Sequence, residues 1–169
     1  MRRFVGFVAV SLVGLVSVLA TQWRVLSIEK LAEAADAIVL GTVTSKTCQR
    51  DSQGRIFTRV ELSAKEHWKG PKSSFAIVHA GGVLGDVAVT ADGLEQYDVG
   101  EEVVAFVRFN ARGEGVTVGM SQGKFNVWKR DGRTFVRNRF HGASDNSPTP
   151  GSKSLGIEEF KARVTGGSK

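Results

Sequence analysis

Residues 55–68, RIFTRVELSAKEHW, alternate between two kinds of side chain along the whole segment. One parity is mainly apolar, and the other is mainly polar or charged. The apolar parity comprises Ile56, Val60, Leu62, Ala64 and Trp68. Because successive side chains of a strand point to opposite faces, this period of two predicts a long, half-buried β-strand.

The segments on both sides of this strand are also strand-like. Residues 37–47 are rich in β-branched side chains and contain Gly41, which indicates a bend such as a barrel corner. Residues 103–107, VVAFV, are apolar on both faces and predict a central strand. Shorter strands are expected over residues 75–80, 87–90 and 116–120.

Two helices and one hairpin complete the expected elements. Residues 27–36 read as a short helix capped by Ser27, and residues 155–164 as a last helix. Asp131-Gly132 is a favoured two-residue turn pair and predicts a hairpin over residues 123–140. A β-rich chain of this kind avoids open sheet edges by closing into a barrel or a sandwich.

Composition and the N-terminal segment bound the class of protein. The chain has 169 residues, of which 41% are hydrophobic and 24% are charged, with a formal charge of +6. These values fit one folded domain and exclude a collagen, a disordered tail and a polytopic membrane protein. A basic start, an apolar run over residues 4–20 and Val18-Leu19-Ala20 predict a signal peptide over residues 1–20. An uncleaved N-terminal membrane anchor is the alternative.

The expected organisation follows from these boundaries. We expect an exported protein, periplasmic or extracellular, with no stable membrane insertion after the signal is cleaved. The mature chain divides into a β-barrel domain with its N-terminal helix over residues 21–142, a linker over 143–154 and a helix with a tail over 155–169. The glycine-rich connection over residues 81–97 is either a binding loop or a cap over one barrel end.

Four segments carry a resemblance to known proteins. They are residues 35–43 (ADAIVLGTV), 68–70 (WKG), 99–107 (VGEEVVAFV) and 122–125 (QGKF). Together they resemble small secreted bacterial proteins of unassigned activity. The first three are also similar to the netrin-like module of tissue inhibitors of metalloproteinases. The resemblance covers roughly residues 27–140 and implies a mainly β fold: a small OB-like barrel, closed or partly open, with a short N-terminal and a C-terminal helix.

The resemblance also implies protein binding, directed in that module at a secreted protease. Its inhibitory contact uses an N-terminal cysteine, whereas the mature chain here would begin near Thr21-Gln22-Trp23. The disulfides of that module are absent as well, because Cys48 is the only cysteine. That inhibitory contact therefore has no matching residue in this chain.

The residues with catalytic or metal-binding potential do not form a motif. Cys48, His67, His79 and His141 lack the spacing of a zinc site, so we expect neither a metal nor a cofactor. Cys48 is expected to be a buried apolar residue, with a reactive thiol or an intermolecular bridge as the alternatives. Ser121 lies in a Gly-x-Ser-x-Gly match between two strands, without the helix that a nucleophile elbow requires. A serine hydrolase is thus only a remote alternative, and no catalytic residue is assigned.

The hairpin is the most informative candidate site. Residues 124–139 hold six lysines and arginines against one acid, Asp131. With Asp131-Gly132 as the turn, one face of the hairpin carries two aromatic rings among cations. The candidate binding residues are Lys124, Trp128, Arg130, Arg133, Phe135, Arg137 and Arg139. A bound polyanion would offset the like charges that face each other across the strands. Cation–π stacking under the C-terminal helix is the structural alternative.

The expected function is therefore non-catalytic binding outside the cytoplasm. A protein partner is the first hypothesis, as the resemblance implies. Binding of an anionic polymer or nucleic acid through the hairpin is the alternative.

Overall fold

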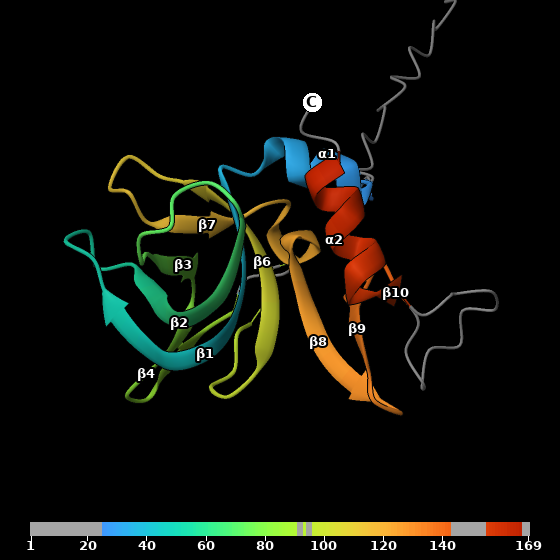
Figure 1. Ribbon diagram of the computed structural model, residues 1–169. Helices are drawn as coiled ribbons and strands as arrows, with labels where there is room; N and C mark the ends of the chain where they lie inside the picture. Colours follow the sequence, from blue (N-terminus) through green and yellow to red (C-terminus); the bar gives the residue numbers. More distant parts are fainter. Residues whose placement is uncertain (1–24, 91–92, 94–95, 143–154, 167–169) are drawn as a thin grey trace, which may run out of the picture.

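The computed structural model describes residues 25–90, 93, 96–142 and 155–166 (Figure 1). The expected signal peptide over 1–20 and the expected linker over 143–154 lie outside these residues. The elements are α1 (Ile28–Ala34), β1 (Ala37–Arg50), β2 (Ile56–Lys69), β3 (Ala76–Ala80), β4 (Gly82–Leu84), β5 (Val87–Val89), β6 (Glu102–Phe109), β7 (Gly115–Thr117), the 3₁₀ helix η1 (Met120–Gly123), β8 (Lys124–Arg130), β9 (Arg133–Arg137), β10 (Leu155–Gly156) and α2 (Ile157–Gly166).

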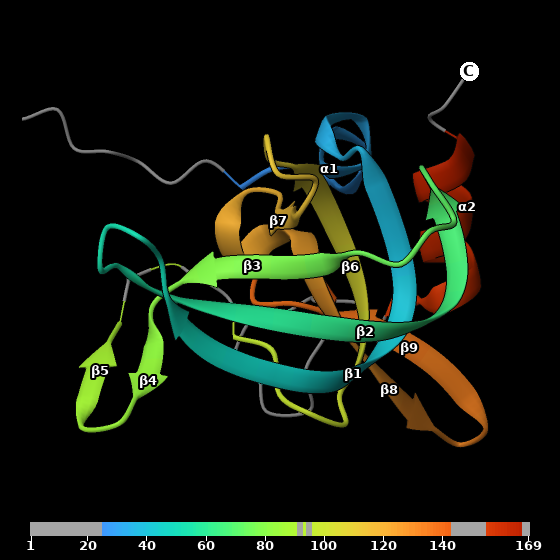
Figure 2. The same ribbon diagram turned by 90° about the vertical axis from the view of Figure 1, so that its left-hand side faces the viewer.

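Five strands close into a barrel, as the OB-like prediction expects. Their order around the barrel is β1-β2-β3-β7-β6, and β6 returns to pair with β1. All neighbours are antiparallel except β3 and β7, which are parallel. The chain is therefore mainly β, with α1 before the first barrel strand and α2 at the C-terminal end of the described residues (Figures 1 and 2).

β1 and β2 curl around the barrel because their pairing is interrupted by register shifts. One shift lies next to Gly41, where a Cβ atom would come within 2.7 Å of the Ser63 carbonyl oxygen. The bend predicted at this glycine is confirmed. The predicted inward face of β2 holds only as far as Leu62, because Ala64 is exposed and Trp68 packs outside the barrel.

The protein has two hydrophobic cores, which share β6. Val103, Ala105 and Val107 point into the barrel, whereas Val104 and Phe106 pack under the two helices. All five side chains are fully buried, which confirms the prediction of a central strand. The outer core also contains Phe125, Val136, Phe160 and Val164, which join α2 to the hairpin β8–β9.

Both helices form close to the predicted positions. Ser27 caps α1, and its hydroxyl accepts a hydrogen bond from the Lys30 amide. α2 begins at Ile157 rather than at Leu155, because Leu155 and Gly156 form a short strand that pairs with Val136 and Phe135 of β9. This strand anchors α2 beside the hairpin.

Candidate functional site

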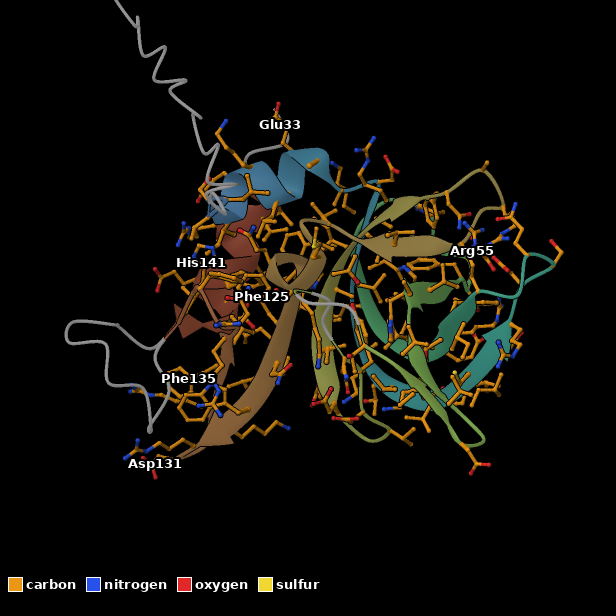
Figure 3. All side chains as sticks on the ribbon, turned by 180° about the vertical axis from the view of Figure 1, so that it is seen from behind. Glu33, Arg55, Phe125, Asp131, Phe135 and His141 are labelled. Atoms are coloured by element: carbon orange, nitrogen blue, oxygen red, sulfur yellow. The ribbon has the colours of Figure 1, made fainter. Side chains whose placement is uncertain are left out.

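The hairpin β8–β9, termed the basic ribbon, has the predicted register. Trp128 faces Phe135, Arg130 faces Arg133, and Asn126 faces Arg137. Asp131 and Gly132 have φ values of 50° and 73°, the left-handed conformation that a two-residue type I′ turn requires. The tip of the ribbon extends away from the barrel, as the positions of Asp131 and Phe135 in Figure 3 show.

Aromatic rings and one arginine pack together on one face of the ribbon. The rings of Trp128 and Phe135 stack with their centroids 4.9 Å apart and an interplanar angle of 27°. The Arg137 guanidinium carbon lies 5.3 Å from the centre of the Trp128 ring. The cation–π stacking of the structural alternative is thus present at Trp128, which already has one ring and one guanidinium as partners within its own hairpin.

Lys124 is not part of an exposed cationic face, which corrects the sequence-based assignment. Its side chain is only 2% exposed. The ammonium donates to Glu101 Oε2 at 2.7 Å and lies 5.1 Å from the centre of the buried Tyr97 ring. The base of β8 pairs with β6 beside the barrel, so the same strand face is internal at Lys124 and external at Arg130. Lys124 and Arg139 do not face each other across the ribbon, because the described ladder ends at Asn126 and Arg137.

Three other cations of the ribbon, Lys129, Arg130 and Arg133, are exposed, as is Arg139 just beyond β9, whereas Arg137 is half-buried. Arg130 lies 3.6 Å from the Asp131 carboxylate. Within the described part of the chain, no carboxylate lies within ion-pair distance of Arg133 or Arg139, nor of Lys129 on the opposite face. Elsewhere many lysines and arginines have carboxylate partners: Lys46 with Asp98, Arg55 with Asp51, Lys65 with Glu102, and Lys161 with Glu66.

The barrel end beside the base of the ribbon is electrostatically compensated. Lys46 Nζ donates to Asp98 Oδ1 at 2.8 Å. This hydrogen bond, followed by the charges of Lys46 and Lys124, holds the pKa of Asp98 below its ordinary value. Positive charge is therefore neutralised around Lys124, whereas Lys129, Arg130 and Arg133 near the tip and Arg139 just beyond β9 stay exposed.

Ser121 does not lie in a nucleophile elbow. It is buried inside η1, a 3₁₀ helix that joins β7 to β8. Its amide donates to the Gly93 carbonyl, and no hydrogen bond joins its hydroxyl to a histidine among the described residues. The local geometry does not expose this hydroxyl at the start of an α-helix, as the elbow requires.

The three histidines and Cys48 do not converge on one point. In the described part of the chain, no group of three His, Cys, Asp or Glu side chains could hold a metal ion. His141 stacks on Phe125 and bonds through Nε2 to the Leu26 carbonyl at 2.8 Å. It fixes the segment before α1 against the hairpin.

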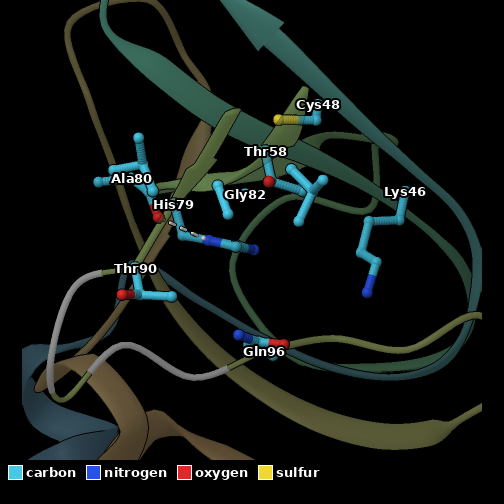
Figure 4. Close-up of a pocket in the computed structure, with 11 residues that line it drawn as sticks. Lys46, Cys48, Thr58, His79, Ala80, Gly82, Thr90 and Gln96 are labelled. Carbon is cyan, nitrogen blue, oxygen red and sulfur yellow. Dashed lines mark hydrogen bonds between the residues drawn. The ribbon is translucent and has the colours of Figure 1, made fainter. Parts of the chain in front are cut away.

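A cavity of about 310 Å³ lies at the barrel end beneath β4 and β5 (Figure 4). Cys48, Thr58 and His79 form a row across β1, β2 and β3, because each is the direct cross-strand neighbour of the next. His79 Nδ1 bonds to the Ala80 carbonyl oxygen at 3.1 Å, and its buried Nε2 has no partner among the described groups. Within the glycine-rich connection over residues 81–97, the β4–β5 hairpin contributes to the lining of this cavity.

The sequence analysis did not identify a second hollow, of about 400 Å³, between β3 and β7. It is lined on one side by Val78 and Ala80 and on the other by Val116 and Met120. Arg55 and Arg112, from the loops that follow β1 and β6, stand at its edge. The turn residues of these loops do not indicate a binding site in the sequence, because the hollow forms only where strands that are distant in sequence come together.

Comparison with protein-family models and with curated proteins finds no match. Neither of the two described helices is long and apolar enough to cross a membrane.

Proposed function

We propose that this chain is an exported, non-catalytic binding module whose basic ribbon inserts into an acidic site on a protein partner outside the cytoplasm. The observation that carries the proposal is the set of exposed cations on a projecting hairpin, Lys129, Arg130 and Arg133, with Arg139 just beyond the end of β9. Like charges that face each other, such as Arg130 and Arg133, disfavour a free hairpin and are relieved by a bound anionic surface.

The shape of the ribbon favours a protein over a nucleic acid. Single-stranded nucleic acids bind in basic grooves where aromatic rings are free to stack on bases. Here Phe135 and Arg137 already pack on the ring of Trp128. A two-stranded projection that carries its charge at the tip fits into a concave acidic site instead. The netrin-like resemblance makes a secreted protease the first partner class to test.

Binding of an anionic polymer is the second candidate. It is favoured by the number of cations that have no carboxylate partner among the described residues. Binding of this kind weakens steeply with salt, because each neutralised phosphate releases a counterion.

The test uses two charge reversals, Arg133→Glu on the ribbon with Arg139→Glu just beyond the end of β9. The matched control is Lys72→Glu with Arg108→Glu, which reverses two exposed cations outside the ribbon. Crosslinked pull-downs from the native envelope fraction are compared among the two variants and the unaltered protein. We expect the same partner protein with the unaltered chain and the control, and its loss with the ribbon variant. Equal recovery with all three would reject the ribbon as the binding element.

A heparin column and a polyphosphate column separate the two candidates. If the partner is a protein, the ribbon variant loses that partner, while elution from both columns changes no more than it does for the control. Selective loss of column retention, with no protein partner recovered, identifies the polymer instead.

A further inference from the structure

The barrel is closed between β3 and β7 by a single residue pair, Ile77 with Gly115. Every other junction in the barrel has at least three such pairs. Figure 1 shows β3 and β7 side by side. Of the two strands that flank β3, β7 is much shorter than β2. The hollow of about 400 Å³ lies where this pairing stops.

The alternation of backbone hydrogen bonds shows which groups face the hollow. The Gly81 amide donates to the Ile56 carbonyl, so Ile77 and His79 bond towards β2, and Val78 and Ala80 point away from it.

The same alternation applies on the other side of the hollow. The Val118 amide donates to the Phe106 carbonyl, so Val116 bonds towards β6 and Thr117 points towards β3. Val78 C=O, Ala80 N–H and both backbone groups of Thr117 therefore face the hollow. They do not form the next rung of the ladder.

Apolar side chains line the outer part of the hollow. Val116 is 42% exposed and Met120 is 45% exposed. Met120 has a φ of 61°, a left-handed conformation that is uncommon for a residue other than glycine. Two exposed apolar groups therefore stand beside an open strand edge.

Arg55 and Arg112 are positioned at one end of the hollow with part of each guanidinium group unused. Arg55 donates through Nε to Asp51, and Arg112 donates through Nε to Glu114. Their side chains are 72% and 65% exposed, and neither Nη1 nor Nη2 of either arginine donates a hydrogen bond within the described residues. Each arginine is held by its loop and still presents the paired donors that bind a carboxylate.

The two carboxylates that hold these arginines are already occupied by other donors. Asp51 also accepts from the Gln53 and Arg55 amides, and Glu114 also accepts from the Asn110 side-chain amide. These carboxylates therefore do not compete for the free guanidinium donors. An additional carboxylate has to come from a ligand.

We propose that the β3–β7 hollow binds an extended peptide segment that carries an apolar side chain and, at one end, a carboxylate. Backbone groups that face outward from β3 recur every two residues, roughly 6.6 Å, which is the repeat of an extended chain. The peptide adds as a strand along Val78 and Ala80, as in β-augmentation. Its apolar side chain rests on Val116 and Met120, and Arg55 and Arg112 bind its carboxylate.

The experiment uses a positional-scanning library of acetylated pentapeptides with free C-termini, measured by fluorescence anisotropy on the full mature chain. We expect selection for β-branched or other apolar residues near the C-terminus and at least a tenfold loss of affinity when the carboxylate is replaced by an amide. N-methylation of the amide that pairs with Val78 C=O is expected to cause a similar loss. No peptide above background, or equal binding of the N-methylated peptide, would overturn the proposal.

Protein variants assign the binding to the hollow. Arg55→Gln with Arg112→Gln and, separately, Val116→Glu are expected to weaken the selected peptide at least fivefold. Lys72→Gln and Val99→Glu, which alter exposed residues away from the hollow, are the controls. Amide NMR shifts at residues 78–80 and 115–117 are expected on titration. Shifts confined to residues 124–139 would reject the hollow and would leave the proposed function of the ribbon intact.

Discussion

Lys161 Nζ and Glu66 Oε2 lie 2.6 Å apart and join α2 to the far end of β2. The Trp68 indole N–H donates to the same carboxylate oxygen at 2.9 Å. Lys161 also lies 5.8 Å from the centre of the Trp68 ring. One carboxylate thus collects two donors, and the C-terminal helix is tied to a strand that is distant in sequence.

The first prediction concerns the acid sensitivity of this contact. The hydrogen bond from Lys161, with that from Trp68, holds the pKa of Glu66 below its ordinary value of 4.5. Because the pKa is lowered on folding, the stabilisation is complete above pH 4.5 and is lost as the pH falls through the folded-state pKa. The difference in free energy of unfolding between the unaltered protein and Glu66→Gln should therefore shrink between pH 6 and pH 3. Urea titrations measure it, with Glu159→Gln as the control, and a constant difference would contradict the prediction.

The second prediction concerns Phe160, which is fully buried. Its ring packs against Trp68, Phe106 and Phe125 at centroid distances of 6.0, 5.8 and 4.6 Å. Phe160→Ala should lower the free energy of unfolding by about 3–5 kcal/mol, the usual cost of such a cavity. Urea denaturation measures it against Glu159→Ala, an exposed position on the same helix. Similar losses for both variants would show that α2 does not contribute to the core.

The third prediction separates Lys124 from the cations of the ribbon. Lys124→Met removes the buried donor to Glu101 and to the Gln96 carbonyl. It should cost about 1–3 kcal/mol, because the acceptors lose a bond that water replaces incompletely. Arg133→Met, at an exposed position, should change the stability by less than about 0.5 kcal/mol. Thermal unfolding of both variants measures the difference. Equal melting temperatures would contradict the prediction and would indicate that Lys124 is exposed like Arg133.

The fourth prediction compares two glycines with similar backbone angles. Gly54 and Gly70 have φ values of 78° and 83°, but a Cβ atom at Gly54 meets nothing within 4 Å. At Gly70 it would collide with the Asp36 carbonyl oxygen and come within 2.9 Å of the Ala37 Cα. Gly54→Ala should therefore cost about 1–2 kcal/mol from the left-handed conformation alone. Gly70→Ala should lower the free energy of unfolding clearly more than Gly54→Ala does. Chemical denaturation measures both, and equal losses would contradict the predicted steric clash at Gly70.

The fifth prediction is that neither chelator nor reductant changes the melting curve. Cys48 is the only cysteine, and the described residues include no group able to hold a metal. Melting curves with EDTA, with dithiothreitol and with neither should superimpose. A drop of several degrees in EDTA would reveal a structural metal, because loss of the metal removes folding free energy directly.

The local elements of this fold were predictable because their signals are local. Alternation over residues 55–68 indicated β2, the doubly apolar run at residues 103–107 indicated β6, and Asp131-Gly132 fixed the register of the ribbon. Each of these patterns depends on neighbours within a few residues. The cap at Ser27 and the bend at Gly41 belong to the same category.

The environment of a strand face was not predictable in the same way. Lys124 and Arg130 have the same parity on β8, but one is internal and the other exposed. The difference arises because the pairing of β8 with β6 ends at Asn126, and Arg130 lies beyond it. The hollow between β3 and β7 was missed for a similar reason. It results from a parallel contact between Ile77 and Gly115, which no local periodicity encodes.

β6 has a consequence for how this protein can change by mutation. Between Val103 and Val107 every side chain belongs to one of the two cores, so this segment has no solvent-facing position at which substitutions are free. A larger residue at an even position would push against the helices, and one at an odd position would press on the barrel interior. In a saturation library, variants should therefore be depleted at all five consecutive positions, whereas an ordinary half-buried strand shows depletion at every second one. Such an unbroken block would identify this strand in the sequence of a distant relative even where the ribbon and the loops had diverged.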